Sequence, residues 1–444
     1  MPKRRLKAAV FIISTVFLLS TAPAASGGNS ETLTIDNKTL RLRECITIGL
    51  KSNPTGEISK QGLKAIQEKI GEAKAGYYPS LKLSSAYTYS SPALLMSKEA
   101  SPDNYDNRLA VRQTLFDAGA TANLVQGVRH TITAQEYDTT KTGLDIRLTV
   151  STLFIDVLKK EALLAVAKAA LSGTEQHRLQ SQALYKEGVS PRADVIKSEV
   201  QVSTARLSVI SADNAVLAAK AALSAFMGVP VTIQFDVDGK EVERMQHHPL
   251  PDVREALDQA YHLRPELMGV KARLAAADAA ISQAESGFYP SVSLDASYGW
   301  QESTFVPTDT KWGVGVTVAL PVFEQLTTRS KVGQAVANRD GLKASETQAL
   351  RAVELEVQQA WLGLKEAQER QTVAGKALEQ ATEDMRVSEG RYQEGLGVIL
   401  EVIDAQTALT QAKTNQVVAA FDIATAQVKL DRATGQRPTE ETGK

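Results

Sequence analysis

The sequence contains one long unit written twice, and this duplication limits the possible folds more than any other feature. The triplet Tyr78-Pro79-Ser80 returns as Tyr289-Pro290-Ser291, an offset of 211 residues (290 − 79). Further along the chain the offset is 207, and the pairs that show it are Phe116 and Phe323, Tyr185 and Tyr392, and Gly228 and Gly435. Self-similarity at a fixed period indicates a repeated structural unit. The change in offset predicts a loop of different length in each copy, because length changes collect in exposed loops.

Around that loop the hydrophobic pattern changes from a helical period to a period of two. The loop is expected at 91–107 in the first copy and at 302–310 in the second. Small or polar residues separate the apolar positions, which are Leu81, Leu83, Tyr87 and Tyr89, then Leu109, Val111 and Leu115, then Val292, Leu294, Tyr298 and Trp300, then Trp312, Val314, Val316, Val318 and Leu320. Strict alternation of this kind predicts four strands, two in each copy, with one apolar face.

Aromatic residues mark both ends of these strands. Those near the loops are Tyr87, Tyr89, Tyr298, Trp300 and Trp312, and those at the opposite ends are Tyr78, Phe116, Tyr289 and Phe323. About eleven residues at about 3.3 Å each, tilted by about 45°, span roughly 25 Å, which is the height of the apolar band of a membrane barrel between its aromatic girdles. Four strands are too few to close a barrel, so several chains would have to share one. A soluble sandwich with one wet face is the alternative.

The rest of the chain is predicted to be helical. Two long helices are expected at 118–186 and 327–392, with returning helices at 191–227 and 399–433 and leading helices at 57–76 and 266–287. The second long helix has small or apolar residues at 3/4 spacing, namely Leu350, Val353, Val357, Ala360, Leu364, Ala367, Gln371, Ala374, Leu378, Ala381, Met385, Ser388 and Tyr392. A seven-residue repeat of this length predicts coiled-coil packing. A returning and a leading helix, placed end to end, cover roughly the length of one long helix.

Each long helix is expected to reverse at a glycine-containing tip. Gly395 and Gly397 interrupt the second helix, since glycine tolerates the left-handed backbone of a tight reversal. Just past this tip, Glu401 and Asp404 stand three residues apart, which places both carboxylates on one side of the next helix. The first tip reads Gly188-Val189-Ser190-Pro191, where Ser190 and Pro191 form a suitable N-cap and first-turn pair.

The N-terminus has the pattern of an export signal. Four basic residues precede an apolar run from Ala8 to Leu19, and a small-residue cleavage site ends at Ala24. No later segment is expected to span a membrane as a helix. The predicted divisions are a signal peptide at 1–24, a first repeat at 25–230, a linker at 231–251, a second repeat at 252–435 and a flexible tail at 436–444.

Several classes of function are not supported by the sequence. The formal net charge is −1, so no polybasic surface calls for nucleic acid. The single cysteine, Cys45, excludes an internal disulfide, and no catalytic residue, cofactor site or metal site is expected. The glycines at 313 and 315 lie within an alternating strand rather than a dinucleotide loop, and the adjacent His247 and His248 lack a third ligand nearby. The protein is not expected to be an enzyme.

Duplicated units of strands, a long helix, a turn and a second helix, with Tyr-Pro-Ser before a strand and Tyr-x-x-Gly tips, resemble the TolC family of outer-membrane efflux proteins. The resemblance covers nearly the whole mature chain. It implies a mainly α protein with membrane β structure: a homotrimer in which each chain lends four strands to a twelve-stranded barrel in outer-membrane lipid, above a helical tunnel in the periplasm. It also implies a periplasmic adaptor and an inner-membrane pump as partners, with drugs, metals or secreted polypeptides as substrates.

The resemblance also implies roles for residues at the tips. Glu401 and Asp404 match the acidic pair that lines the periplasmic entrance, and Tyr392 is a candidate for holding that entrance closed through a hydrogen bond. The residues implied to dock the adaptor are Gly188, Val189, Ser190, Gly395, Leu396 and Gly397. Some family members carry a basic gating residue two places after the tip glycine, a place that is Gly397 here. The alternatives are that these are ordinary turn and surface residues, or that the chain is an exported coiled-coil structural or adhesive protein.

Overall fold

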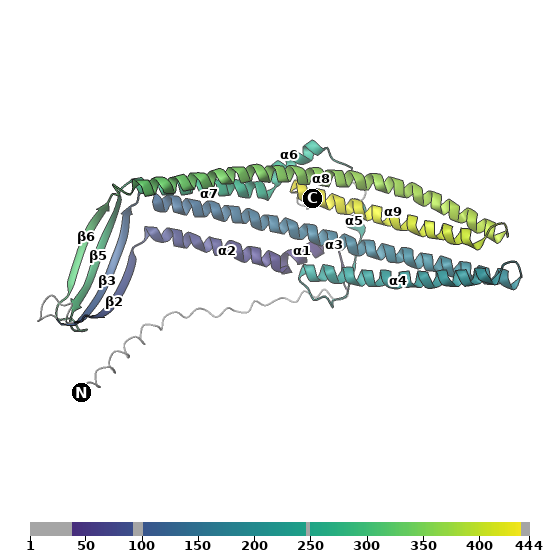
Figure 1. The fold of residues 1–444 in the computed structure, drawn as a ribbon, viewed down its shortest axis with the longest axis horizontal. Coiled ribbons are helices and arrows are strands. Elements are labelled where there is room, and N and C mark those ends of the chain that lie inside the picture. The colour runs from purple at the N-terminus through teal and green to yellow at the C-terminus, as the bar shows by residue number, and fades with distance from the viewer. Residues whose placement is uncertain (1–37, 92–100, 246–248, 437–444) are drawn as a thin grey trace, which may run out of the picture.

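A computed structural model of the chain describes residues 38–91, 101–245 and 249–436. The expected signal peptide, most of the expected tail, and His247 and His248 lie outside the described residues. The molecule is long and narrow, with a four-stranded sheet at one end and two helical hairpin tips at the other (Figure 1).

The two copies contain the same series of elements. In the first copy these are α1 (Leu42–Ser52), α2 (Pro54–Lys74), β2 (Ser80–Tyr89), β3 (Asp103–Phe116), α3 (Ala120–Lys186) and α4 (Arg192–Met227). In the second copy they are α6 (Val253–Leu263), α7 (Pro265–Glu285), β5 (Ser291–Glu302), β6 (Lys311–Ala319), α8 (Gln325–Gln393) and α9 (Ile399–Thr434). Short 3-10 turns, Ala75–Tyr77 and Ser286–Phe288, join α2 and α7 to their strands. The predicted duplication of helices and strands is therefore confirmed.

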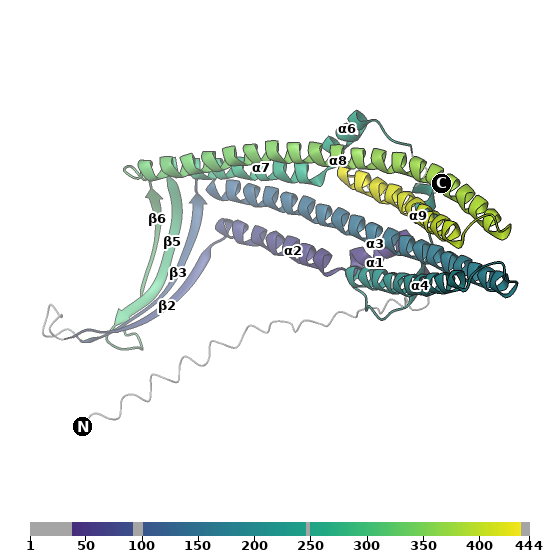
Figure 2. The ribbon, with the colours of Figure 1, turned by 45° about the vertical axis from the view of Figure 1, so that its right-hand side comes forward.

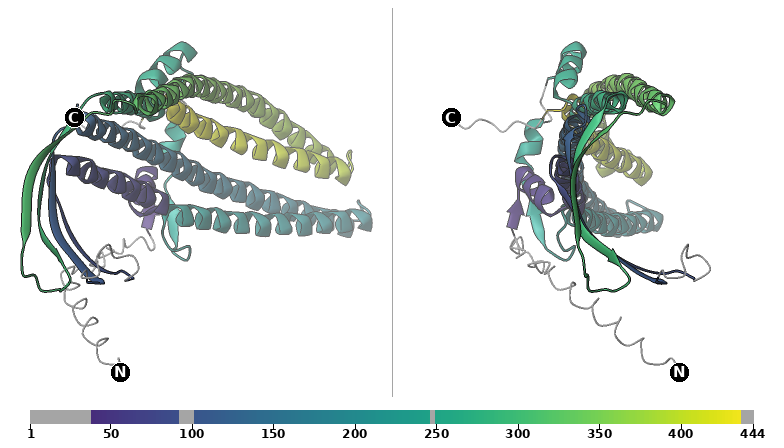
Figure 3. Two further views of the ribbon diagram at one scale, coloured as in Figure 1. Left: turned by 60° about the vertical axis from the view of Figure 1, so that its left-hand side comes forward. Right: turned by 90° about the vertical axis from the view of Figure 1, so that its left-hand side faces the viewer.

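The four strands form one antiparallel sheet in the order β2-β3-β5-β6, which curves strongly (Figure 3). Strand β3 begins at Asp103, so the expectation of a loop through residue 107 was wrong. Polar residues at 103, 104, 106 and 107 hide the alternation in the sequence. Tyr105 nevertheless lies opposite Tyr87 in the sheet, with ring centroids 4.9 Å apart.

The helices pack in two long hairpins joined side by side (Figure 2). Helix α4 packs along α3, α9 packs along α8, and α3 in turn contacts both α7 and α9. The 3/4 pattern of α8 forms its seam, because Val353, Val357 and Leu364 are almost fully buried. The predicted coiled-coil packing is thus confirmed.

The short helices meet end to end at a joint that is made twice. Gly228 ends α4 and Gly435 ends α9, both with left-handed backbones. A Cβ on Gly228 would lie 2.2 Å from the Ser52 carbonyl oxygen, so only glycine lets α4 approach the end of α1. Across the first joint Asn53 donates a 2.6 Å hydrogen bond to the Phe226 carbonyl, and across the second Arg264 donates to the Ala433 carbonyl at 3.1 Å.

The segment expected to be a linker has structure of its own. It contains strand β4 (Phe235–Val237), which pairs in parallel with β1 (Lys38–Leu40), and helix α5 (Lys240–Met245). Six residues are fewer than two helical turns, which is too short for a period to show in the sequence. This part packs against α1, α3 and α4 in the largest buried apolar cluster, where burial raises the pKa of the Cys45 thiol to about 12.

Helix α4 corrects a further expectation. By length and composition it could cross a membrane, contrary to the expectation that no later segment could. In the structure one side of α4 packs along α3, while an apolar stripe on its other side is exposed. The apolar residues of α4 therefore lie on two sides of the helix, one packed against α3 and the other exposed in the single chain.

Candidate functional site

The tip of the second hairpin is closed by backbone hydrogen bonds around one left-handed glycine. Gly395 has a φ of +74°, and the amide of Leu396 donates to the Arg391 carbonyl at 2.8 Å. Gly397 does not have a positive φ, so the expectation of a second left-handed glycine was wrong. Its lack of a side chain matters for space, since a Cβ there would lie 3.2 Å from the backbone nitrogen of Tyr392 and from Glu401 Oε2.

The first tip turns in the same way but starts its returning helix differently. Gly188 has a φ of +75°. Pro191, not Ser190, occupies the N-cap of α4, and the Ser190 hydroxyl is buried with no hydrogen-bond partner among the described residues. The expected Ser190 cap was therefore wrong, because a capping side chain must come from the residue directly before the first helical one, and that residue is a proline.

Two large apolar side chains stand exposed at the tips. Val189 is 61% exposed and Leu396 is 70% exposed. Neither side chain is needed for the backbone reversal, which rests on the glycines beside them. The tips therefore present apolar surface that the hairpins themselves leave uncovered.

Tyr392 joins the second hairpin to the first. Its ring is 4% exposed and packs with Met385, Ile399 and Val402. Its hydroxyl lies within hydrogen-bond distance, 3.3 Å, of the fully buried Ser181 hydroxyl on α3. The duplicate of Tyr392 in the first copy, Tyr185, is 46% exposed, so the two tips are not equivalent.

Sequence reasoning missed Ser181. A signal was present, because Ser181 and Ser388 stand 207 residues apart (388 − 181), at equivalent places in the two long helices. Both serines are buried. A repeated polar residue at a seam position marks a place where the packing contains a hydrogen bond.

The two acidic residues lie where α9 begins, and the structure adds a basic residue to them. Glu401 and Asp404 are on the part of α9 that faces away from the buried seam residues Val402 and Ala405. Arg391, the residue before Tyr392, places its Nε 3.8 Å from Glu401 Oε2 across the turn. Sequence reasoning missed this arginine because it considered only the position after the tip glycine. Glu401 therefore has a basic partner that comes from the preceding helix, α8.

The structure places the nine expected girdle aromatics near the ends of the strands. Seven of the nine are more than half exposed: Tyr78 (68%), Phe116 (52%), Tyr87 (55%), Tyr89 (62%), Tyr289 (61%), Trp312 (77%) and Phe323 (98%). Tyr298 is nearly as exposed, and the Trp300 indole donates to the Phe305 carbonyl. Exposed aromatics at both ends of an exposed apolar sheet are the pattern of membrane girdles.

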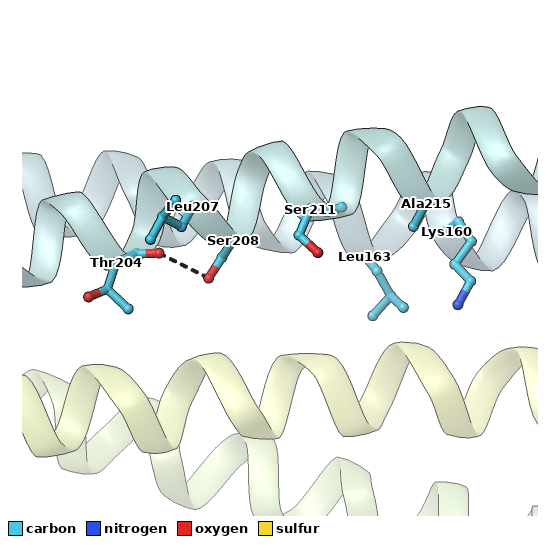
Figure 4. A pocket seen from close by; sticks show the side chains of 8 residues that line it. Lys160, Leu163, Thr204, Leu207, Ser208, Ser211 and Ala215 are labelled. Carbon is cyan, nitrogen blue, oxygen red and sulfur yellow. Dashed lines mark hydrogen bonds between the residues drawn. The ribbon is translucent and has the colours of Figure 1, made fainter.

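A groove between α3 and α4 has a volume of about 500 Å³ (Figure 4). Lys160 and Leu163 line it from α3, and a row from Thr204 to Ala215 lines it from α4. The Ser208 hydroxyl donates to the Thr204 carbonyl of its own helix. The Thr204 hydroxyl likewise donates to the Val200 carbonyl, so these two hydroxyls are bonded to their own helix. Among the described residues no group of three or more His, Cys, Asp or Glu could hold a metal ion.

Both copies of the repeat match the same known protein family. The sequence profile of the family described as outer membrane efflux protein matches residues 50–229 and 256–436. CyaE of Bordetella pertussis is 23% identical over 408 residues, covering 89% of this chain and 84% of CyaE. The outer membrane protein TolC of Escherichia coli is 23% identical over 401 residues, covering 86% of this chain and 80% of TolC.

Solved structures share the fold at lower identity. The structure of CusC matches with a TM-score of 0.77 and 18% identity, covering 89% of this chain and 92% of CusC. The outer membrane protein VceC of Vibrio cholerae matches with a TM-score of 0.73 and 20% identity, covering 89% of this chain and 96% of VceC. The arrangement of curved sheet and long hairpins is thus found in known structures over nearly the whole chain.

Proposed function

Because this chain belongs to the outer membrane efflux protein family, we propose that three copies of it form one continuous duct, in which a periplasmic helical tunnel leads into a shared barrel. The protein is an outer-membrane channel of the class that serves tripartite efflux or type I secretion, with its helices in the periplasm. Its relatives are channel proteins and not enzymes.

The single observation that carries the proposal is the incomplete sheet. Strands β2 and β6 each have a neighbour on one side only in the described chain. Unpaired backbone groups cannot remain in the hydrocarbon of a bilayer, so a membrane sheet must close into a barrel. Three chains with four strands each supply twelve strands, which is within the range of membrane barrels.

The helical half supports the same assembly. Helix α4 exposes an apolar stripe on the side opposite α3, formed by Ile196, Val200, Leu207, Ile210 and Leu217. Helix α8 exposes another on the side opposite α9, formed by Leu355, Leu362, Val373 and Val387. Repeated seven-residue spacings occur in both stripes, as in a coiled-coil seam. We propose that α4 of one protomer packs against α8 of the next, at the same two edges of the protomer where the strands are unpaired.

The acidic mouth and the tips have separate roles in this proposal. Three copies bring six carboxylates, from Glu401 and Asp404, around the periplasmic entrance. There the Tyr392–Ser181 contact holds the two hairpins together in the closed arrangement, and the Arg391–Glu401 pair braces the turn of the second hairpin. The exposed Val189 and Leu396 dock the hairpin tips of a periplasmic adaptor, which links the duct to an inner-membrane pump.

The test of assembly compares two neighbouring residues on α4. Leu207→Asp places a charge in the exposed apolar stripe, whereas Ser208→Asp places the same charge at the next residue, outside that stripe, and both residues line the groove beside α3. Cross-linking in detergent followed by mass measurement should give trimers for the wild type and for Ser208→Asp, and mainly monomers for Leu207→Asp. A stable wild-type monomer that forms no channel in lipid bilayers would contradict the proposal.

Docking through the tips is tested with bulky substitutions. Val189→Trp and Leu396→Trp should abolish efflux while the protein still reaches the outer membrane, and Val189→Ala serves as the matched control. Normal efflux with both tryptophans in place would show that these side chains do not contact the adaptor.

A further inference from the structure

The register of the sheet separates its charged residues from its apolar ones. The apolar face carries Leu81, Leu83, Leu109, Val111, Leu294, Val314 and Val316 on neighbouring strands, and most of these are exposed in the single chain. In a membrane barrel the apolar face meets lipid and the other face lines the lumen. The lumen face holds the charged residues Lys82, Asp106, Arg108, Arg112, Asp295 and Lys311.

One row across the lumen face is neutralised. Arg112 lies opposite Asp295, and its Nε is 2.5 Å from Asp295 Oδ1. Asp295 also accepts hydrogen bonds from Ser293 at 2.9 Å and Thr317 at 3.1 Å. Its oxygens thus accept hydrogen bonds from Arg112 of its own row and from Ser293 and Thr317 of the adjacent row, so this carboxylate is already paired.

The next rows toward the loops keep their positive charge. Lys82 lies opposite Ala110, while Arg108 lies between Ser84 and Gly299, with Lys311 next in the same row. All three basic side chains are exposed, and none has a salt-bridge partner in the described part of the chain. The remaining acid of this face, Asp106, lies two residues along β3 from Arg108, at the loop side.

The backbone leaves no space for an acidic side chain at Gly299, the residue opposite Arg108. A Cβ on Gly299 would lie 2.3 Å from the Asn107 carbonyl oxygen, so this position cannot take aspartate without displacing β3. Asp103 and Glu302 belong to the opposite face, at the loop end of the sheet. The lumen face thus has four basic and two acidic residues, a net charge of +2 per chain and +6 for three chains.

We propose that Lys82, Arg108 and Lys311, here named the basic belt, make the barrel lumen selective for anions. The inference rests on the proposed trimeric channel and assigns specificity to its membrane part. Rings of Arg and Lys select anions in pores, and low-dielectric walls strengthen their field. The solutes favoured in the barrel are small anions and the carboxylate or phosphate groups of larger ones.

The belt and the acidic mouth lie at opposite ends of helices about 100 Å long. That separation is many times the Debye length of about 10 Å at 0.1 M salt, so the two regions act independently.

The experiment measures the chloride-to-potassium permeability ratio of single channels in lipid bilayers under a potassium chloride gradient. The background variant carries Glu401→Gln and Asp404→Asn, which removes the acidic mouth. This background should favour chloride. Adding Lys82→Gln and Arg108→Gln should lower the ratio by about threefold or more. Adding Arg112→Gln and Asp295→Asn instead, which removes one charge of each sign, should leave it unchanged. An equal ratio with and without the belt substitutions overturns the inference.

A second measurement uses the unaltered protein. Inorganic triphosphate added to the loop side should block the wild-type channel more strongly than when it is added to the tip side. Block that is absent, or equal from both sides, overturns the inference. A wild-type protein that forms no conducting pore at all contradicts the proposed channel itself, and this result is distinct from a pore without anion preference.

Discussion

Arg391 and Ser181 contact two residues of the second tip from other helices, and the proposed closure of the mouth depends on these contacts. The hydroxyl of Ser181 meets Tyr392 from α3, and the guanidinium of Arg391 approaches Glu401 from across the turn. Their partners, Tyr392 and Glu401, follow from the repeated tip pattern. The contacts themselves do not, since they depend on how two hairpins and one turn are placed in space.

We expect Tyr392→Phe combined with Arg391→Gln to open the mouth. A hydrogen bond contributes about 1 kcal/mol, so losing one in each of three chains shifts the closed–open equilibrium by about two orders of magnitude. Single-channel recordings should show a higher conductance or a larger open fraction. Tyr185→Phe is the matched control, because its ring is half exposed in the first tip. Recordings identical to wild type would show that these contacts do not hold the mouth.

The acidic pair is expected to control cations at the entrance. In the proposed trimer six carboxylates surround the entrance, and the field of such an acidic ring attracts cations. Glu401→Gln with Asp404→Asn should therefore reduce cation preference and the block by multivalent cations added at the tip side. The equivalent Asp194→Asn in the first copy is the control. Unchanged selectivity would show that the pair does not line the pore.

At the scale of elements, the sequence predicted the helices better than their connections. The long helices begin and end within two residues of the expected positions, because the glycines of the two tips mark where they reverse. The start of β3 and helix α5 were missed, since a few polar residues or a single short helix contain no period to read. The ends of α4 and α9 at Gly228 and Gly435 were marked by the repeat, but not the buried ion pairs beside the second joint.

That second joint contains a network of charges. Arg264 and Arg432 are almost fully buried, and both contact Glu266, at 3.0 and 2.8 Å. Arg432 also contacts Asp145 of α3 at 2.6 Å. Burial alone raises the pKa of Glu266, but the hydrogen bond from Arg432 and the charges of both arginines outweigh it and lower this pKa below its usual value.

We expect this joint to weaken in acid. Because the folded pKa of Glu266 is lowered, its contribution to stability is full above the unfolded pKa of about 4.3 and is lost as the pH falls through the folded value. Glu266→Gln should reduce the free energy of unfolding at pH 7 by about 1.5–3 kcal/mol, since both buried arginines lose one charged partner while Arg264 keeps Glu356 and Arg432 keeps Asp145. Thermal unfolding from pH 7 to pH 3 should show a smaller pH dependence for the variant. An equal loss of stability in acid would contradict the assignment.

At the scale of the whole molecule, the two faces of the sheet should respond oppositely to the same charge. Val316 is 62% exposed on the apolar face, whereas Ser297 lies on the lumen face between Ala110 and Gly313. Val316→Asp should impair assembly in membranes, because a charge on the lipid face is destabilising, by about 2–4 kcal/mol for Arg or Lys at the bilayer midplane and by less for Asp. Ser297→Asp should be tolerated. Ser293→Asp is a second lumen variant, although Ser293 is bonded to Asp295. Heat-resistant trimers counted after outer-membrane extraction provide the measurement, and equal losses on both faces would refute the assignment.

The unpaired edges of β2 and β6 also set the conditions under which this protein can mature. If the duct is the proposed trimer, a lone protomer has to keep two strand edges and an apolar sheet face in water until it meets two others. Such edges pair readily with any other exposed strand, so productive association competes with aggregation. The rate of association therefore depends steeply on the local concentration of protomers. When export is slow, each protomer remains unassembled for longer, and when export is fast, the concentration of unassembled protomers rises. The yield of assembled protein should therefore pass through a maximum as the rate of synthesis rises.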